Sequence, residues 1–284
     1  MVDGLSAAVR ALSFIALFQA AGMALFFALW DGRLGACEPA LRRIGIVAAL
    51  VAGVLLTAQY ALEAARMGGE FAGALDPSLQ AIVLHSSTAA AFACRLVALA
   101  LVAFALSARG TRSAVMGIVG VTLVSASFAL MGHTTTHPDR WLLGVMLVAH
   151  LLIVAFWFGA LVPLYLASVR ESAATAGAMT DAFSAIALWI VPVLFIAGLV
   201  LAIFILQSLA ALRTTYGQLV LVKVAGFAVL MGFAALNKWR LGPALSRGDA
   251  RATAAFRRSL VAEYVLIAAV LSVTAVLTSF YSPE

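Results

Sequence analysis

Side chains that bind transition metals are concentrated in one short part of the chain. Met131 and His133 lie just before a run of threonines, His137 lies just after it, and Met146 and His150 follow with a spacing of four residues. In a helix, residues spaced four apart share one face. Imidazole nitrogen and thioether sulfur together suit copper, and thioether sulfur suits Cu(I) in particular. These residues therefore predict a copper site, with Cu(I) favoured over Cu(II).

Each of these side chains also has a structural explanation. A methionine in an apolar helix usually packs, which applies to Met146, and His137 can be a solvated loop residue. His150 differs because it lies well inside an apolar segment, where an ionisable side chain is expensive and usually serves a function. We expect His150 to form the floor of the metal site and the segment around His133 to form its outer lip.

His85, the fourth histidine, and Lys223 lie at a similar depth to His150. With a rise of about 1.5 Å per residue, His85 lies about 9 Å from the outer end of its expected span, Lys223 about 10 Å and His150 about 14 Å. His85 is a second candidate metal ligand. Lys223 is not a metal ligand while it carries a proton. It can instead bind an anion, pair with an acid such as Glu63, or set the potential of the site.

A second polar pair is expected deeper in the membrane. Arg95 lies about 24 Å from the outer end of its span, and Glu263 lies about 25 Å from the outer end of the last span. Equal depth predicts a salt bridge between them, with Gln59 and Asn237 as polar neighbours. This pair can hold two helices together or can serve as a gate in transport. In either case, removing one partner would leave a buried charge unpaired and would destabilise the protein.

The composition places all of these residues in an integral membrane protein. Apolar residues make up 64% of the chain and charged residues 11%, with a mean hydropathy of +1.10. A soluble domain carries far more charge. The net charge of +6 indicates loops that face anionic lipid rather than a nucleic-acid partner. Cys37 and Cys94 form no disulfide framework and no CxxC motif.

Several segments are long and apolar enough to cross a bilayer, which takes about 20 residues. They lie near residues 6–30, 41–66, 79–107, 114–132, 141–169, 181–207, 216–238 and 253–280. None shows the alternation, over about ten residues, of an outer-membrane barrel strand. The sequence thus predicts a single all-α domain over residues 1–284, a bundle of about eight transmembrane helices in the lipid bilayer.

Lysine and arginine are distributed unevenly between the two ends of these segments. The first, third, fifth and seventh connectors hold most of them, whereas the other side, termini included, holds only Arg10, Arg66, Arg140 and Arg213. Positively charged loops stay on the cytoplasmic side. We therefore expect both termini and the loop around His133 to face the periplasm of a bacterial inner membrane.

Short stretches of the first half resemble stretches of the second half. They are QAIVLH (Gln80–His85) with QLVLVK (Gln218–Lys223), AGVLL (Ala52–Leu56) with AGLVL (Ala197–Leu201), and the residues around Gly22 with those around Gly159. Four spans separate the partners, so the halves would run in the same direction as a parallel 4+4 repeat. The alternative is that apolar helices look alike. A true repeat would put His85 and Lys223 at corresponding positions.

The second half of the chain also carries a series of longer motifs. Gly132-His133 is followed by HLLIVAFWFGALVPL, which starts at His150, then by AFSAIALWIVPVLFIAGLVLA and TTYGQLVLVKVAGFAVLMGFAALNKWRLGPAL. This series resembles the CopD family of copper-resistance membrane proteins, with residues 181–280 as the CopD-like C-terminal part. The first half resembles the family more loosely.

The resemblance implies an inner-membrane protein of copper handling. The family is associated with copper uptake into the cytoplasm, with periplasmic CopC-like copper-binding proteins as donors. It implies importance for His133, His150 and Lys223, and its pattern continues through Asn237 to Pro243. The chain has no MxxxM or MxM run of a methionine-rich copper transporter. The path of the ion across the inner half is therefore left open.

Three functions fit these residues. The leading hypothesis is a copper permease, in which the outer histidines receive periplasmic copper and His85 and His150 hold it deeper, with Met131 or Met146. The second is a membrane b-type cytochrome, with His85 and His150 as axial ligands of one haem. The third is a copper sensor or assembly protein that binds metal without transporting it. No motif supports catalysis, so we expect no enzyme activity.

Overall fold

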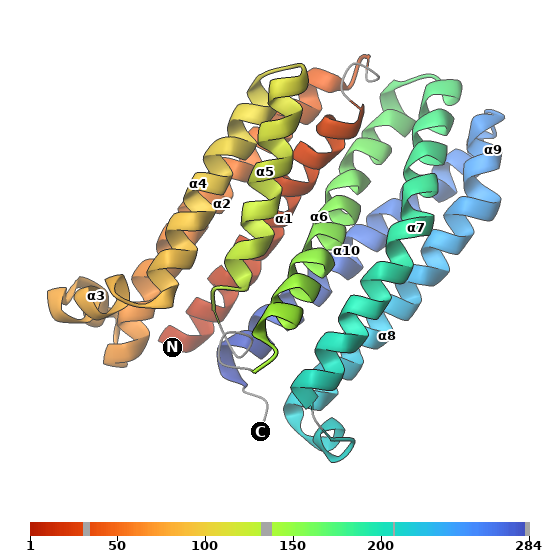
Figure 1. Ribbon diagram of the computed structural model, residues 1–284. Coiled ribbons are helices and arrows are strands. Elements are labelled where there is room, and N and C mark those ends of the chain that lie inside the picture. The colour runs from red at the N-terminus through yellow and green to blue at the C-terminus, as the bar shows by residue number, and fades with distance from the viewer. Residues whose placement is uncertain (31–34, 132–137, 207, 282–284) are drawn as a thin grey trace.

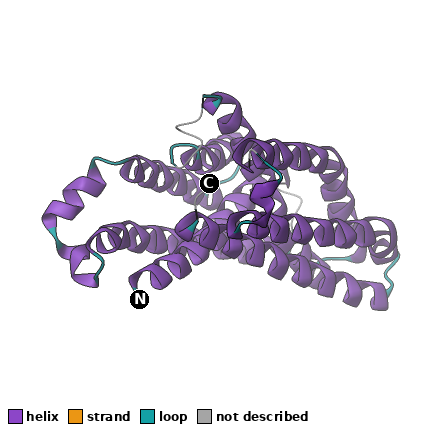
Figure 2. Ribbon diagram, turned by 90° about the horizontal axis from the view of Figure 1, so that it is seen from below, coloured by secondary structure: helices purple, strands orange, loops and turns teal. Residues whose placement is uncertain are grey.

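The computed structural model is a bundle of helices. It describes residues 1–30, 35–131, 138–206 and 208–281, and every regular element within these ranges is helical (Figure 2). In this part of the chain, 8 helices are long and apolar enough to cross a membrane. The prediction of an all-α protein with eight spans is confirmed.

The long helices run back and forth across the bundle (Figure 1). Their bounds are α1 (Val2–Trp30), α2 (Glu38–Gly68), α4 (Ser87–Ser107), α5 (Thr111–Phe128), α6 (Arg140–Arg170), α7 (Ala173–Leu206), α8 (Thr215–Leu236) and α10 (Ala250–Phe280). The short elements described between them are η1 (Phe71–Leu75), α3 (Pro77–Leu84), η2 (Ala210–Arg213), the π-helical η3 (Asn237–Leu241) and α9 (Gly242–Ser246). The last two continue α8, so that one candidate span covers Thr215–Ser246.

The expected span 79–107 is two helices, α3 and α4, which meet at His85 and Ser86. Ser86 has an extended backbone, and its hydroxyl oxygen accepts a hydrogen bond from the Thr88 N–H at 3.2 Å. A serine in this position starts a new helix. His85 therefore lies between two helices instead of inside one, and Arg95 lies only about 12 Å from the start of α4.

The helices form two groups that lie side by side (Figure 1). We call α1 to α5 the N-terminal half and α6 to α10 the C-terminal half. The central helix is α1, which packs against α2, α4 and α5 of its own half and against α6 and α10 of the other. The start of α1 and the end of α10 lie at the same end of the bundle, as an even number of spans requires (Figure 1).

The two halves approach each other most closely where α1 crosses α6. Gly22 of α1 faces Gly159 of α6, and a Cβ added at Gly22 would lie 2.6 Å from the Gly159 Cα and overlap the Ala155 carbonyl oxygen. A Cβ added at Gly159 would overlap the backbone of Gly22. Small residues at helix crossings let membrane helices pack backbone to backbone. This crossing therefore leaves no room for a side chain at either position.

At the end of the bundle opposite the termini, Glu171 joins α6 to α2. Its carboxylate accepts a hydrogen bond from the N–H of Cys37, the residue before α2, at 2.9 Å. Hydrogen bonds from Cys37, and from the N–H groups of Ala36 and Gly35, lower the pKa of Glu171. Burial and the contact with Glu171 raise the pKa of the Cys37 thiol to about 12. The thiol therefore stays protonated at neutral pH and is not poised to bind a metal.

Candidate functional site

His150 lies on α6 with its ring against α7. A Cβ added at Gly198 of α7 would lie 3.5 Å from Cε1 of His150 and 3.6 Å from Nδ1, so the ring lies within van der Waals reach of α7 at this glycine. Nδ1 is buried and has no hydrogen-bond partner among the described residues. Buried polar atoms are normally bonded, and an exception calls for an explanation such as an unseen ion or a chemical role.

Two polar groups interact with the imidazole of His150. One is the Leu194 carbonyl of α7, and the other is the ammonium group of Lys223 on α8. Met146 lies one turn before His150 on α6, on the same face. The site therefore combines an imidazole and a thioether with a neighbouring positive charge. That charge opposes the binding of a cation for as long as Lys223 keeps its proton.

Glu263 of α10 forms a second buried site, with 2% of its surface exposed. One carboxyl oxygen accepts a hydrogen bond from Trp157 Nε1 of α6 at 3.1 Å, and the other from Asn237 Nδ2 at 2.5 Å. The expectation that Asn237 neighbours Glu263 is confirmed. Asn237 is the first residue of the π-helical η3, and short π-helical segments are frequent at functional sites.

Arg95 of α4 is also buried, with 5% of its surface exposed. Its Nε donates to the Ser127 hydroxyl at 2.9 Å, and its guanidinium group lies over the Phe128 ring, 4.2 Å from the centroid. The predicted salt bridge with Glu263 is wrong, because the two residues lie in different halves with different partners. The helix break at Ser86 explains the error, since it moves Arg95 toward the outer end of the bundle.

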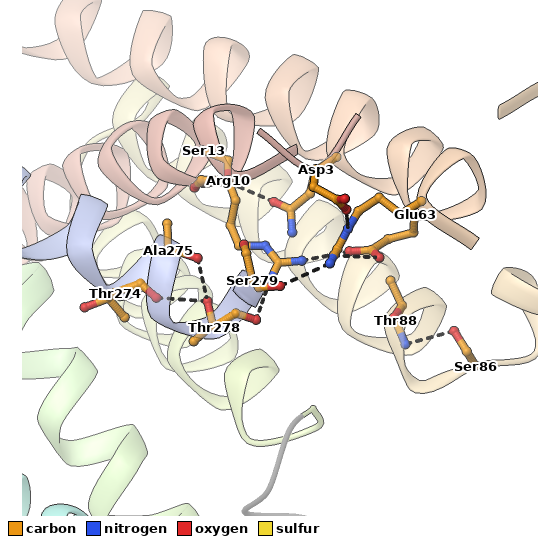
Figure 3. Close-up of polar contacts among 12 residues, drawn as sticks. Asp3, Arg10, Ser13, Glu63, Ser86, Thr88, Thr274, Ala275, Thr278 and Ser279 are labelled. Atoms are coloured by element: carbon orange, nitrogen blue, oxygen red, sulfur yellow. Dashed lines mark hydrogen bonds and ion pairs between the residues drawn. The ribbon is translucent and has the colours of Figure 1, made fainter. Parts of the chain in front are cut away.

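A cluster of ionic side chains joins α1, α2 and α10 at the end that holds the termini (Figure 3). Arg10 of α1 donates to Glu63 of α2 at 2.8 Å and to the Thr278 carbonyl of α10 at 2.9 Å. Arg66 of α2 donates to the Ser279 carbonyl at 3.1 Å. These carbonyls belong to the last turn of α10, where the helix itself supplies no partner and a positive charge is favourable.

Glu63 is the acid at the centre of this cluster. Its carboxylate lies 2.8 Å from a nitrogen of Arg10 and 3.5 Å from one of Arg66, and Arg66 also lies 3.2 Å from Asp3. The alternative in which Glu63 pairs with Lys223 is therefore wrong. Lys223 lies on α8 in the other half, where its charge acts on His150.

Met131 lies at a small cavity in the N-terminal half. The cavity has a volume of about 10 Å³ and is lined by Leu56, Gln59, Tyr60, Glu63, Thr88, Phe92, Arg95 and Met131. A cavity of this size holds about one water molecule. Its other lining residues come from α2 and α4, so this contact groups Met131 with the N-terminal half rather than with His150.

The other predicted ligands do not join His150 in the described structure. His85 is exposed at the end of α3, which packs against α2, η1 and α4 at the edge of the N-terminal half (Figure 1). This arrangement does not support a haem held by both His85 and His150. His133 and His137 lie outside the described residues. Among the residues that are described, no three His, Cys, Asp or Glu side chains are placed to hold a metal ion.

Two polar contacts were not predicted from the sequence, although helical spacing and depth in the membrane point to the residues that make them. Trp157 follows His150 by seven residues, which is two turns along the same face of α6. Arg10 and Glu63 each lie within about 12 Å of the outer end of their helix. Comparing depths, as was done for Arg95 and Glu263, would therefore have predicted that Arg10 and Glu63 pair.

Both halves of the chain match family models. Residues 1–140 match the model described as copper resistance protein D-like, N-terminal domain, and residues 177–277 match copper resistance protein D. Copper resistance protein D of Pseudomonas syringae pv. tomato is 29% identical over 308 residues, covering 100% of this chain and 98% of the relative. No solved structure matches the chain.

These matches agree with the motifs read from the sequence and with the helical architecture. The two models follow one another along the chain, and the relative aligns with it from end to end. Together with the eight apolar helices, they make this a multi-pass bacterial membrane protein. Over residues 1–140 and 177–277 the chain is thus similar to the copper resistance protein D family, CopD.

Proposed function

We propose that the chain is a copper permease that takes Cu(I) from the periplasm toward the cytoplasm. The observation that carries the proposal is His150, whose Nδ1 is buried without a partner while Met146 lies one turn away. Imidazole and thioether groups suit Cu(I). Copper is the transported substrate here, and a site with few ligands binds it weakly enough to let it move on.

The proposal includes an orientation and a donor. The excess of lysine and arginine in alternate connectors supports both termini facing the periplasm of the inner membrane. A CopC-like periplasmic protein would then deliver copper to the loop that carries His133 and His137. His85, exposed at the junction of α3 and α4, lies outside the proposed path, and the permease neither binds haem nor catalyses a reaction.

We further propose that the two halves are a parallel repeat. Gly22 and Gly159, which correspond in the sequence, face each other at the crossing of α1 and α6. Equivalent residues meet in this way around a two-fold axis. The packing of α1 on α2 and α10 likewise has a counterpart in the packing of α6 on α7 and α5. In this repeat His150 corresponds to Ser13, since each precedes its glycine by nine residues.

The first test of the proposal is an anaerobic Cu(I) titration of the detergent-purified protein. We expect stoichiometric binding that His150→Ala weakens at least tenfold, or roughly 1.4 kcal/mol. His85→Ala is the matched control, because it removes an exposed histidine of the N-terminal half and should leave the affinity unchanged. Binding that is indifferent to His150→Ala would contradict the assignment of His150.

A second test separates a permease from a copper sensor or assembly protein. Proteoliposomes that contain the wild-type protein should accumulate Cu(I) in their lumen faster than empty liposomes, and His150→Ala should slow this accumulation. Tight binding without accumulation would contradict transport and favour the sensor or assembly role.

A further inference from the structure

Glu263 carries an acid deep in the C-terminal half. It lies about 25 Å along α10 from Phe280 and about 20 Å from Ala250, near the middle of the helix. Only 2% of its surface is exposed. Its partners, Trp157 and Asn237, are both neutral and both donate to it.

The charged and titratable groups on the elements packed against Glu263 do not bond to its carboxyl group. They are Asp3 and Arg10 on α1, Arg140, His150, Tyr165 and Arg170 on α6, Tyr216 and Lys223 on α8, Lys238 and Arg240 in η3, and Arg251, Arg257, Arg258 and Tyr264 on α10 itself. Several have other partners: Arg10 bonds to Glu63, Arg257 bonds to Ser168, and Lys223 lies beside His150. The adjacent Tyr264 stacks on Phe158. Among the described residues, Glu263 is therefore an acid without a counter-ion.

A carboxylate in such a place is expensive, because an isolated charge inside a protein or a bilayer loses its hydration. Two neutral donors offset only part of that loss, whereas binding a proton removes the charge. Each carboxyl oxygen has a neutral side chain as its hydrogen-bond partner, so neither contact balances a negative charge.

We propose that Glu263 binds a proton and exchanges it for the copper ion that passes through the C-terminal half. The inference rests on the proposed permease function and supplies its inner step. His150 and Trp157 lie on one face of α6 about 10 Å apart, so the outer copper site and the proton site share a helix. Cu(I) at His150 and a proton on Glu263 each add one positive charge to the interior of the C-terminal half, and the single carboxylate balances one of them at a time.

The exchange balances in atoms and charge. As Cu(I) binds the imidazole and thioether of the outer site, the O–H bond of Glu263 breaks, the carboxylate balances the charge of the ion, and the proton leaves toward the side from which copper came. When the ion moves on, a proton from the other side restores the neutral acid. One Cu(I) therefore crosses inward for one proton outward, and no net charge crosses the membrane.

The binding step is tested by infrared difference spectroscopy of the purified protein with and without anaerobic Cu(I). We expect copper to remove the C=O stretching band of a protonated carboxylic acid in the wild type. Glu263→Gln, which mimics the neutral acid and should fold, should lack this change. Asp181→Asn, at an exposed acid of α7, should keep it. A wild-type spectrum without a copper-sensitive acid band, or a band that survives Glu263→Gln, would overturn the proposal.

The exchange step is tested in proteoliposomes that contain a pH-sensitive dye. Inward Cu(I) flux through the wild type should raise the pH of the lumen by one proton per copper, and Glu263→Gln should reduce this signal at least tenfold. Copper flux without a pH change would overturn the exchange. If copper does not cross at all but its binding still removes the acid band, the permease function fails while the proton site at Glu263 stands.

Discussion

The two halves of this protein treat their buried polar residues in opposite ways. In the N-terminal half, Arg10 and Arg66 enclose Glu63, and Ser13 donates to Gln59 at 3.0 Å. In the C-terminal half, Lys223 lies beside a histidine, and Glu263 has only neutral partners. In the first half this cluster pairs its charges and holds helices together, although the buried Arg95 has Ser127 and Phe128 as partners instead of an acid. In the second half neither Lys223 nor Glu263 has an ion-pair partner among the described residues, which is costly for stability and useful for binding an ion or a proton.

Burial follows the same division. The most apolar part of α1 is 67% buried, whereas that of α7 is 11% buried and that of α8 is 6% buried. In the C-terminal half, α7 packs mainly against α6 and α9, and α8 mainly against α10. The half that carries His150 is therefore the more loosely enclosed one, and helices with few buried contacts are the ones that can move most readily.

The largest expected effect concerns the contact between the halves. Gly22→Ala or Gly159→Ala puts a Cβ into the backbone of the facing helix, which cannot yield as a flexible side chain would. We expect a loss of about 3 kcal/mol in the free energy of unfolding, measured by denaturant titration in detergent. Gly232→Ala on α8 is the control, because a Cβ there meets nothing within 4 Å. Equal stability of Gly22→Ala and Gly232→Ala would show that the halves are not in such close contact.

The next effect concerns the ionic cluster of the N-terminal half. Glu63→Ala leaves Arg10, whose side chain is only 10% exposed, without its acid, and should cost about 3 kcal/mol of unfolding free energy. The Cu(I) affinity of the folded protein should not change, because the cluster joins α1, α2 and α10, whereas His150 interacts with groups on α7 and α8. If Glu63→Ala had normal stability but bound copper more weakly, the ionic cluster would serve copper binding instead of stability.

The smallest of these effects concerns the charge beside His150. Lys223→Met removes the ammonium group and should strengthen Cu(I) binding about tenfold, or roughly 1.4 kcal/mol. Lys223→Arg keeps the charge and is the control for the same anaerobic titration. Weaker copper binding in Lys223→Met would mean that the lysine supports the site instead of opposing a cation.

Much of the architecture could be predicted because the bilayer imposes it. Apolar runs of about 20 residues must be helices, since lipid supplies no partner for backbone groups. The break between α3 and α4 was missed, although Asp76 and Ser86 are both residues that start helices. A continuous apolar run concealed it. The importance of His150 followed from its position in an apolar segment, and its partners did not.

The class of this protein, its eight spans and the kinds of ligand that it can offer follow from the order of its amino acids alone. Which polar residues meet depends on how the helices pack. Depth along a helix says how far a side chain lies from the membrane surface, and it says nothing about the direction in which the side chain points. Arg95 and Glu263 are separated because the helix break at Ser86 changes the depth of Arg95 and because the two residues lie in different halves, while Trp157, Asn237 and Glu263 meet from three different elements. Helix rotation and crossing are set by side-chain packing, such as the contact of Gly22 with Gly159, and packing involves the whole chain.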